Sequence, residues 1–368
     1  MLGDKRHAGR IIGLAAAAML AVACMAVGPA SAGAAPAAHA GASAHTSGAA
    51  ADPGRTIAGR YKFHHRTYRF IEYVPRSLRP GRRVPLVVMV HGAQTTAEQE
   101  IHATGFNRIA EREGFVVLYP DVDDVGRIAP GPINQSWLFY DPLTYFRGYG
   151  DAAAIASLTR DTMTRAPIDP RRVYVVGVSA GGLMQSALTA SYPDLYTAAV
   201  NVESAGYMDA FCFTTGTGLP VELSAQLAFA EMGPRARVVP TMVITSDADL
   251  AFPHQCGEKA LEQALRTGDL ALSGHQNAPL ALTPASISHQ REPGGYRYDV
   301  STYRGPGGCL VAEKWLIHGM PHKWPGGPTD DTKWAGYADR KAPNGAQGAW
   351  DFVRQFTMPT TRLPAACS

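Results

Sequence analysis

One serine lies in the segment GVSAGG, residues 177–182, which contains the pattern G-x-S-x-G. The apolar run VYVV precedes this pattern and the helix-favouring run LMQSALTAS follows it, so a sharp turn between a strand and a helix is predicted. Small neighbours allow such a turn, and the amino terminus of a helix favours developing negative charge near the hydroxyl. Ser179 is therefore the candidate nucleophile of an acyl-transfer reaction.

A serine hydroxyl becomes an effective nucleophile when a positioned base removes its proton. After a turn of this kind, the order along the chain is serine, acid, histidine. The histidines downstream of the serine are His254, His275, His289, His318 and His322. His322 lies just after the last expected strand, and a loop there reaches the carboxyl edge of the sheet beside the serine. We expect His322 to be the base, and we expect a structural role for His318, which lies at the end of that strand.

The acid is expected after the preceding strand, where residues 241–245 run into the loop SDADLAFP. Asp247 and Asp249 are both candidates, because either carboxylate could hold the imidazole tautomer while the other caps the turn. Asp249 lies deeper in the loop and is our choice, with Asp247 in reserve.

Backbone N–H groups are expected to bind the oxyanion of the tetrahedral intermediate. Ala180, directly after the serine, supplies one of them. The second is expected from the loop after the apolar strand PLVVMVH, where Gly92 allows an unusual backbone conformation, and either Ala93 or Gln94 would be the donor.

Short apolar runs that alternate with helical stretches predict an α/β fold with a mostly parallel central sheet flanked by helices. An antiparallel pair is expected over 61–74. Further strands are expected at 85–91, 115–119, 173–178, 198–202, 241–245 and 314–317, and helices at 98–112, 151–165, 180–191, 258–266 and 346–356. Three segments, 121–149, 205–235 and 268–308, are expected to be irregular loops that carry the binding site. We predict a single domain over 59–358, followed by a tail over 359–368.

The amino terminus has the order of a secretory signal peptide. Three basic residues precede an apolar, alanine-rich run over 11–27, and a small-residue cleavage site ends at Ala32. A membrane anchor is the weaker alternative, because the apolar run ends at a Gly-Pro pair. We expect a signal peptide at 1–32, a disordered mature terminus at 33–58, and export from the cell.

Four cysteines remain after this cleavage: Cys212, Cys256, Cys309 and Cys367. An even number in an exported chain predicts two disulfides, with three connectivities open. We expect Cys256–Cys309 and Cys212–Cys367, because Cys256 follows the acid loop and Cys309 precedes the strand that leads to the histidine loop. Without C-x-x-C spacing, the cysteines do not predict a metal site.

Composition excludes some function classes for the 368-residue chain. Hydrophobic residues make up 46 %, enough for a large core. The formal net charge of +3 falls to +1 without residues 1–32, which carry three basic residues and one acidic residue. We therefore expect neither a nucleic acid nor a stable membrane association as partner.

Several segments together resemble the polyhydroxybutyrate depolymerase-like esterases, relatives of secreted feruloyl and acetylxylan esterases in the α/β-hydrolase superfamily. The resemblance extends from about residue 82 to residue 327. The segments that carry it are VVMVHGAQTTAEQE, FNRIAEREGFVVLYPD, NQSWLFYDP, IDPRRVYVVGVSAGGLMQSALTASYPDLYTAAVNVESAG, DADLAFP and GMPHKWPGG. It implies the α/β-hydrolase fold, and it supports Asp249 as the acid and His322 as the base.

The resemblance also implies a substrate class, namely oligomeric or polymeric hydroxyalkanoate esters hydrolysed without a cofactor. By analogy, Trp137 and Trp324 line the substrate groove, although buried packing is an equal alternative for each. Ala93 stands where the family often has cysteine, and the loops 211–233 and 268–308 match the family poorly. Two other functions stay open: a feruloyl or acetylxylan esterase acting on plant cell-wall esters, and a catalytically silent secreted binding protein on the same scaffold.

Overall fold

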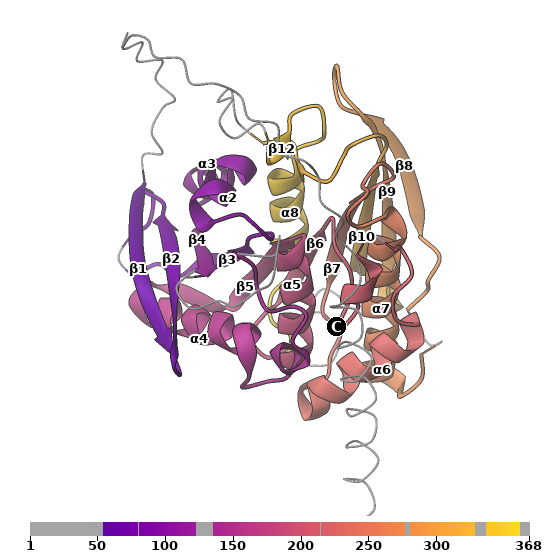
Figure 1. The fold of residues 1–368 in the computed structure, drawn as a ribbon, viewed down its shortest axis with the longest axis horizontal. Helices are drawn as coiled ribbons and strands as arrows, with labels where there is room; N and C mark the ends of the chain where they lie inside the picture. Colours follow the sequence, from indigo (N-terminus) through magenta and orange to yellow (C-terminus); the bar gives the residue numbers. More distant parts are fainter. Residues whose placement is uncertain are drawn as a thin grey trace, which may run out of the picture. The chain divides into compact units, whose positions relative to one another are not determined.

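The computed structural model describes residues 54–79, 81–122, 135–213, 215–276, 280–327 and 336–360. In this part of the chain, ten strands form one sheet in the order β1-β2-β4-β3-β5-β6-β7-β10-β9-β8 (Figure 1). The strands from β4 to β10 in that order are parallel to one another, whereas β1, β2, β8 and β9 pair antiparallel at the two edges. The expected mostly parallel central sheet is confirmed.

The central strands are apolar because helices cover both faces of the sheet. Every residue of four of them is buried: β3 (Val84–Val90), β4 (Val116–Val122), β6 (Ala198–Val202) and β7 (Thr241–Ser246). The other two central strands are β5 (Ile168–Val178) and β10 (Leu310–Ile317). A separate small sheet pairs β11 (Trp324–Pro325) with β12 (Ala338–Asp339).

The edge strands carry weaker sequence signals. The expected antiparallel pair is present as β1 (Arg55–Phe63) and β2 (Arg66–Val74), but β1 begins four residues before the expected domain boundary at residue 59. β8 (Ser286–Arg291) and β9 (Arg297–Arg304) lie in a segment expected to be irregular. All six side chains of β8 are exposed, so no alternation of apolar and polar residues marks it as a strand.

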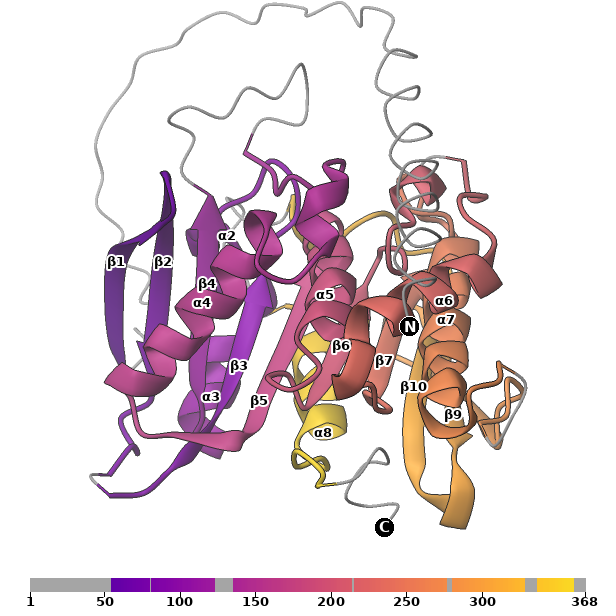
Figure 2. The ribbon, with the colours of Figure 1, turned by 90° about the horizontal axis from the view of Figure 1, so that it is seen from below.

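The helices are α2 (Ala97–Thr104), α3 (Phe106–Glu113), α4 (Gly150–Arg165), α5 (Ala180–Ser191), α6 (Val221–Met232), α7 (His254–Ser273) and α8 (Gly345–Val353). α4, α5, α6 and α7 follow one another along one face of the sheet, and α3 contacts α8 on the other face (Figure 2). The helix expected over 98–112 is two helices, because Gly105 adopts a left-handed φ of 70° between them. α6 lies inside the segment 205–235, which was expected to be irregular.

Buried side chains on the α3 and α8 side form the larger hydrophobic core, which includes Phe106, Phe115, Trp324 and Trp350. A smaller cluster lies between α7 and the β7–β10 part of the sheet. No helix of the described ranges is long and apolar enough to cross a membrane. The expected signal peptide, residues 33–53 of the expected disordered terminus and residues 361–368 of the expected tail lie outside the described residues.

Candidate active site

The candidate site lies at the carboxyl edge of the parallel strands. Neighbouring strands pair there through Val90 with Gly177, Val178 with Val202, Val202 with Ile244, and Ser246 with Ile317. The loops after β3, β5, β6, β7 and β10 therefore begin side by side. In open α/β sheets this edge is where ligands bind.

Ser179 lies on the strained turn that its neighbours predict. Its φ and ψ are 55° and −123°, a conformation that non-glycine residues rarely adopt. A Cβ atom on Gly177 would lie 2.0 Å from the carbonyl oxygen of Gly181, and a Cβ on Gly181 would lie 2.1 Å from that of Val90. These two glycines are needed because strand and helix backbones approach each other too closely for any side chain.

The structure brings Ser179, His322 and Asp249 into one hydrogen-bonded chain. Nε2 of His322 lies 3.0 Å from Oγ of Ser179, and Nδ1 of His322 lies 2.7 Å from Oδ2 of Asp249. A neutral imidazole with its hydrogen on Nδ1, directed to Asp249, has Nε2 available to accept the serine proton. The His322 side chain is 30 % exposed and that of Asp249 is fully buried, so the base is accessible while the acid is shielded.

The second oxygen of Asp249 is held by its own loop. Oδ1 accepts hydrogen bonds from the backbone N–H groups of Ala251 at 2.7 Å and Phe252 at 2.9 Å. Burial alone would raise the pKa of Asp249, but the hydrogen bond with His322 and the effect of the neighbouring Glu203 outweigh it, and the pKa lies below its ordinary value. Asp249 is therefore ionised at neutral pH.

Asp247, the reserve candidate, contacts a different histidine. Its Oδ2 lies 2.8 Å from Nδ1 of His318, and its Oδ1 accepts a 2.7 Å hydrogen bond from the backbone N–H of Gly319. Oγ of Ser246 donates to the carbonyl oxygen of Met320 at 2.5 Å. These bonds join the loop that carries Asp249 to the start of the loop that carries His322. Asp247 and His318 therefore have a structural role.

The loop after β3 lies against the serine, since a Cβ on Gly92 would be 3.3 Å from Cβ of Ser179. The N–H of Gln94 donates to the carbonyl oxygen of Gln135 at 3.1 Å, so this group is already in use. Of the two expected oxyanion donors in this loop, the N–H of Ala93 is therefore the better candidate. Ala180, the first residue of α5, is the other donor candidate.

A buried carboxyl that the sequence analysis missed holds this loop in place. Oε1 of Glu100, on α2, accepts hydrogen bonds from Oγ1 of Thr95 at 3.1 Å and from the N–H of Gly92 at 3.4 Å. Burial raises the pKa of Glu100, and the nearby His91 and these hydrogen bonds oppose that rise. No sequence signal separates Glu100 from Glu98, the exposed carboxyl of the same helix.

The expected groove tryptophans are buried packing residues. Trp137 is fully buried and donates from Nε1 to the carbonyl oxygen of His91 at 2.9 Å. Trp324 is 1 % exposed, and its ring centroid lies 5.9 Å from that of Phe106 in the core. Of the two alternatives for these tryptophans, the structure favours buried packing over a place in the substrate groove, because neither residue is more than 1 % exposed.

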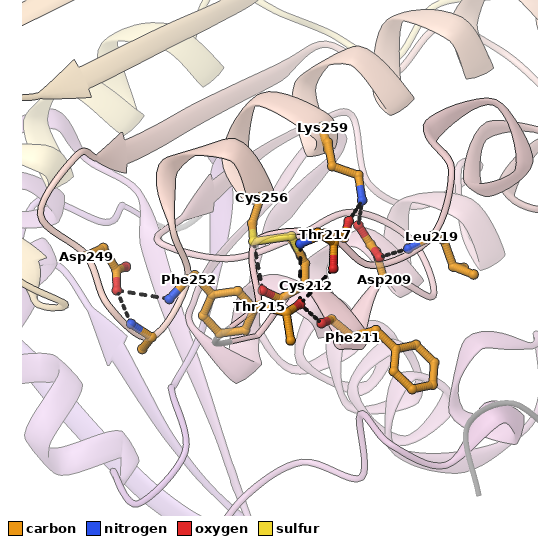
Figure 3. Close-up of a disulfide and its surroundings, with 12 residues drawn as sticks. Asp209, Phe211, Cys212, Thr215, Thr217, Leu219, Asp249, Phe252, Cys256 and Lys259 are labelled. Carbon is orange, nitrogen blue, oxygen red and sulfur yellow. Dashed lines mark hydrogen bonds and ion pairs between the residues drawn. A yellow bond between two sulfur atoms is a disulfide. The ribbon is translucent and has the colours of Figure 1, made fainter. Parts of the chain in front are cut away.

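A disulfide joins the loop after β6 to the start of α7, beside the acid loop (Figure 3). It links Cys212 to Cys256, with the Cα atoms 5.7 Å apart, so both expected pairings of these cysteines are wrong. The reason is topological: β6 and β7 are neighbours in the sheet, and the loops that follow them meet. Cys309 is also disulfide-bonded, and Cys367 lies outside the described residues.

A second unexpected carboxyl lies next to the acid. Side-chain ligand atoms of Glu203, Asp249 and His322 lie within 4.8 Å of one another, the spacing of a possible metal site. Both ring nitrogens of His322 are already hydrogen-bonded, to Asp249 and to Ser179, so the histidine is not free to ligate a metal. The sequence signal for Glu203 was its place directly after the strand 198–202.

Several known proteins are similar to part of this chain in sequence or in fold. Residues 69–214 match the family described as esterase PHB depolymerase. This part of the chain is similar to that family. The matched region contains Ser179 and Glu203 and ends before Asp249 and His322.

The relatives include esterases whose names refer to different substrates. Poly(3-hydroxyalkanoate) depolymerase C of Paucimonas lemoignei is 33 % identical over 132 residues, which are 36 % of this chain and 30 % of the relative. Feruloyl esterase B of Thermothelomyces thermophilus is 32 % identical over 127 residues, 34 % and 40 % of the two chains. Acetylxylan esterase of Coprinopsis cinerea is 34 % identical over 130 residues, 34 % and 32 %. The chain thus spans less than half the length of each of these relatives.

A solved structure of similar fold is the acetyl xylan esterase from Aspergillus awamori. It superimposes with a TM-score of 0.54 and 19 % identity, covering 69 % of this chain and 89 % of that one. The chain therefore has the α/β-hydrolase fold, with a mixed sheet whose centre is parallel.

Proposed function

We propose that this protein is a serine carboxylic ester hydrolase, with Ser179 as nucleophile, His322 as base and Asp249 as acid. The observation that carries the proposal is the continuous hydrogen-bond chain from Oγ of Ser179 through His322 to Asp249. The family match and the α/β-hydrolase fold support the same reaction class.

In this mechanism His322 accepts the serine proton as Oγ attacks the ester carbonyl carbon. The N–H groups of Ala180 and Ala93 stabilise the oxyanion of the tetrahedral intermediate, and Asp249 stabilises the imidazolium. His322 then returns the proton to the departing alcohol. A water molecule, activated by His322, then hydrolyses the acyl-enzyme and releases the carboxylic acid product.

For the substrate we propose short-chain hydroxyalkanoate esters, as oligomers or polymer. Apolar side chains beside the base support this choice. The ring of Phe252 lies 6.0 Å from that of His322, and the ring of Phe213 lies 5.3 Å from Phe252. Phe213 is 45 % exposed, and Leu250, next to Asp249, is 86 % exposed. Phe252 is itself buried, and the exposed side chains of Phe213 and Leu250 favour an ester chain with methyl groups over a hydroxylated sugar.

The second candidate is a feruloyl or acetylxylan esterase. Its support is the similarity to feruloyl esterase B and to acetylxylan esterases, together with the fold of the Aspergillus awamori enzyme. The catalytic steps would be the same, and the difference would lie in the loops that follow β6 and α7.

We further propose that the protein acts outside the cell and has a signal peptide over 1–32. The catalytic domain covers 59–358 together with the preceding residues of β1. The basic n-region, the apolar run and the disulfide support export. N-terminal sequencing of protein collected from culture medium tests the cleavage site.

A panel assay on the purified mature protein tests the activity. It compares p-nitrophenyl butyrate, soluble 3-hydroxybutyrate oligomers, a polyhydroxybutyrate suspension, and feruloylated or acetylated xylan fragments, with Ser179→Ala as the control. Higher kcat/KM on the hydroxybutyrate substrates supports our choice, and higher kcat/KM on the sugar esters assigns the function to the second candidate. A folded protein with no activity on any ester would be a catalytically silent binding protein.

A further inference from the structure

Glu203 is a fully buried carboxyl beside the proposed triad. It follows β6 directly, has a left-handed φ of 47°, and its backbone N–H donates to the carbonyl oxygen of Ile244 at 2.8 Å. Its side chain is 0 % exposed, and one of its oxygens lies within 4.8 Å of both Asp249 and His322. Both features cost free energy in the folded state. A positive φ strains the backbone of a non-glycine residue, and a buried carboxyl loses its contact with water.

The surroundings of Glu203 favour its neutral, protonated form over its ionised form. Neither of its side-chain oxygens has a well-aligned N–H or O–H donor within the described part of the chain, and no lysine or arginine there pairs with it. The buried Glu72, by contrast, lies 2.9 Å from the guanidinium of Arg165. An ionised Glu203 would place a second uncompensated negative charge beside Asp249, which buried sites do not tolerate without a shared proton.

We propose that Glu203 is protonated and donates a hydrogen bond to the carboxylate of Asp249, as a positioning residue that keeps Asp249 directed at His322. This inference rests on the proposed function. Glu203 would then add one hydrogen bond to those that Asp249 already receives from its own loop and from His322. The negative charge stays on Asp249, where it stabilises the imidazolium, and the carboxyl of Glu203 contributes a second side-chain donor beside that of His322.

The titration of the pair follows from this arrangement. Burial raises the pKa of Glu203 well above its ordinary value, and the hydrogen bond and the negative charge of Asp249 raise it further, against a smaller opposing contribution from the backbone N–H of Ser246. The groups facing it are Asp249 and, beyond it, His322. A pKa raised by folding gives stability that is present at low pH and is lost as the pH rises through the folded-state pKa.

The test compares Glu203→Gln with Glu203→Ala, using Glu313→Gln as the matched control. Glutamine keeps the shape and an N–H donor but carries no ionisable proton, so kcat on p-nitrophenyl butyrate should stay within a few-fold of the wild type. Alanine removes the donor and leaves a cavity beside Asp249, so kcat should fall by about 10²-fold, the cost of a misplacement of about 1 Å. KM should change little, because Glu203 does not touch the substrate.

Two further measurements, infrared spectra and the loss of stability at alkaline pH, distinguish a positioning role of Glu203 from a role in stability alone. Infrared spectra of the wild type should show the carbonyl stretch of a protonated carboxyl that moves in heavy water and is absent in Glu203→Gln. Glu313, half-buried on β10 with Oε1 2.8 Å from Nε1 of Trp315, lies outside the triad, so its glutamine variant should keep both that band and the activity. The alkaline loss of stability in the wild type should shrink in Glu203→Gln.

Equal loss of kcat in the glutamine and alanine variants would overturn the proposal, because it would mean that the negative charge of Glu203 is needed. Absence of the protonated band at neutral pH would also overturn it. The infrared and stability readouts need no substrate, so they decide the inference even if no ester is hydrolysed or if Glu203→Ala fails to fold. Failure of the proposed function is therefore distinguishable from failure of this inference.

Discussion

Oδ2 of Asp249 lies 2.7 Å from Nδ1 of His322 across a separation of 73 residues. One loop follows β7 and the other follows β10, two strands that pair in parallel, so the sheet brings the two residues together. A bond of this length between a fully buried carboxylate and an imidazole sets the tautomer in which Nε2 faces Ser179.

Removal of the nucleophile or of the base should abolish turnover without unfolding the protein. Ser179→Ala and His322→Ala should each lower kcat on p-nitrophenyl butyrate by on the order of 10⁴–10⁶, because the two residues act as a unit. Circular dichroism should be unchanged in both. Retention of most of the activity in either variant would contradict the assignment.

The two aspartates of the acid loop should differ. Asp249→Asn should lower kcat by up to about 10⁴ through the wrong imidazole tautomer. Asp247→Asn should cost far less activity, because Asp247 contacts His318 and the N–H of Gly319 rather than His322. Steady-state kinetics of the pair decide the matter, and a larger loss in Asp247→Asn would make Asp247 the acid.

Acid should destabilise the fold through carboxylates that face histidines. Burial would raise the pKa of Asp247 and of Asp299, but hydrogen bonds with His318 and His289 respectively outweigh it and lower both pKa values. A pKa lowered by folding gives stability that is present above the unfolded-state pKa, about 3.8–3.9, and is lost as the pH falls through the folded-state pKa.

The free energy of unfolding should therefore fall as the pH drops through the unfolded-state pKa and below it, and it should fall less in Asp247→Asn than in the wild type. Urea titrations at a series of pH values measure both slopes. Equal slopes would show that Asp247 contributes nothing to the acid sensitivity.

Loss of the disulfide should loosen the region beside the acid loop. It closes a separation of 44 residues, for which chain entropy predicts about 4 kcal/mol of stabilisation. Cys212→Ala/Cys256→Ala should lower the free energy of unfolding by about that amount or somewhat less. Peptide mapping without reduction should recover Cys212 joined to Cys256, and any other partner for either cysteine would refute the pairing.

Exposed apolar side chains near the base should matter most for polymeric substrate. Phe213→Ser and Leu250→Ser should reduce hydrolysis of a polyhydroxybutyrate suspension more than hydrolysis of p-nitrophenyl butyrate, since each removes apolar surface that a long ester chain would contact. Leu282→Ser is the control, because Leu282 is also an exposed apolar residue and lies in the segment before β8 rather than in the loops after β6 and β7. Equal effects on both substrates would argue against a polymer-binding role.

The sequence by itself predicted the features that depend on neighbours in the chain. The turn at Ser179 needs glycines two residues away on either side, and the central strands need continuous apolar runs, so both are visible as local patterns. The order of serine, acid and histidine along sheet-edge loops then pointed to Asp249 and His322. The edge strand β8 was missed because its side chains are all exposed.

Only the tertiary structure decided the features that depend on which loops meet. The pairing of Cys212 with Cys256, the use of the Gln94 N–H by Gln135, and the burial of Trp137 and Trp324 arise from contacts between segments far apart in the chain. Glu203 is the clearest case. Its residue type is ordinary for a surface, and only complete burial beside Asp249 makes its proton part of the site, because the cost of an ionised carboxylate depends on surroundings that no local pattern records.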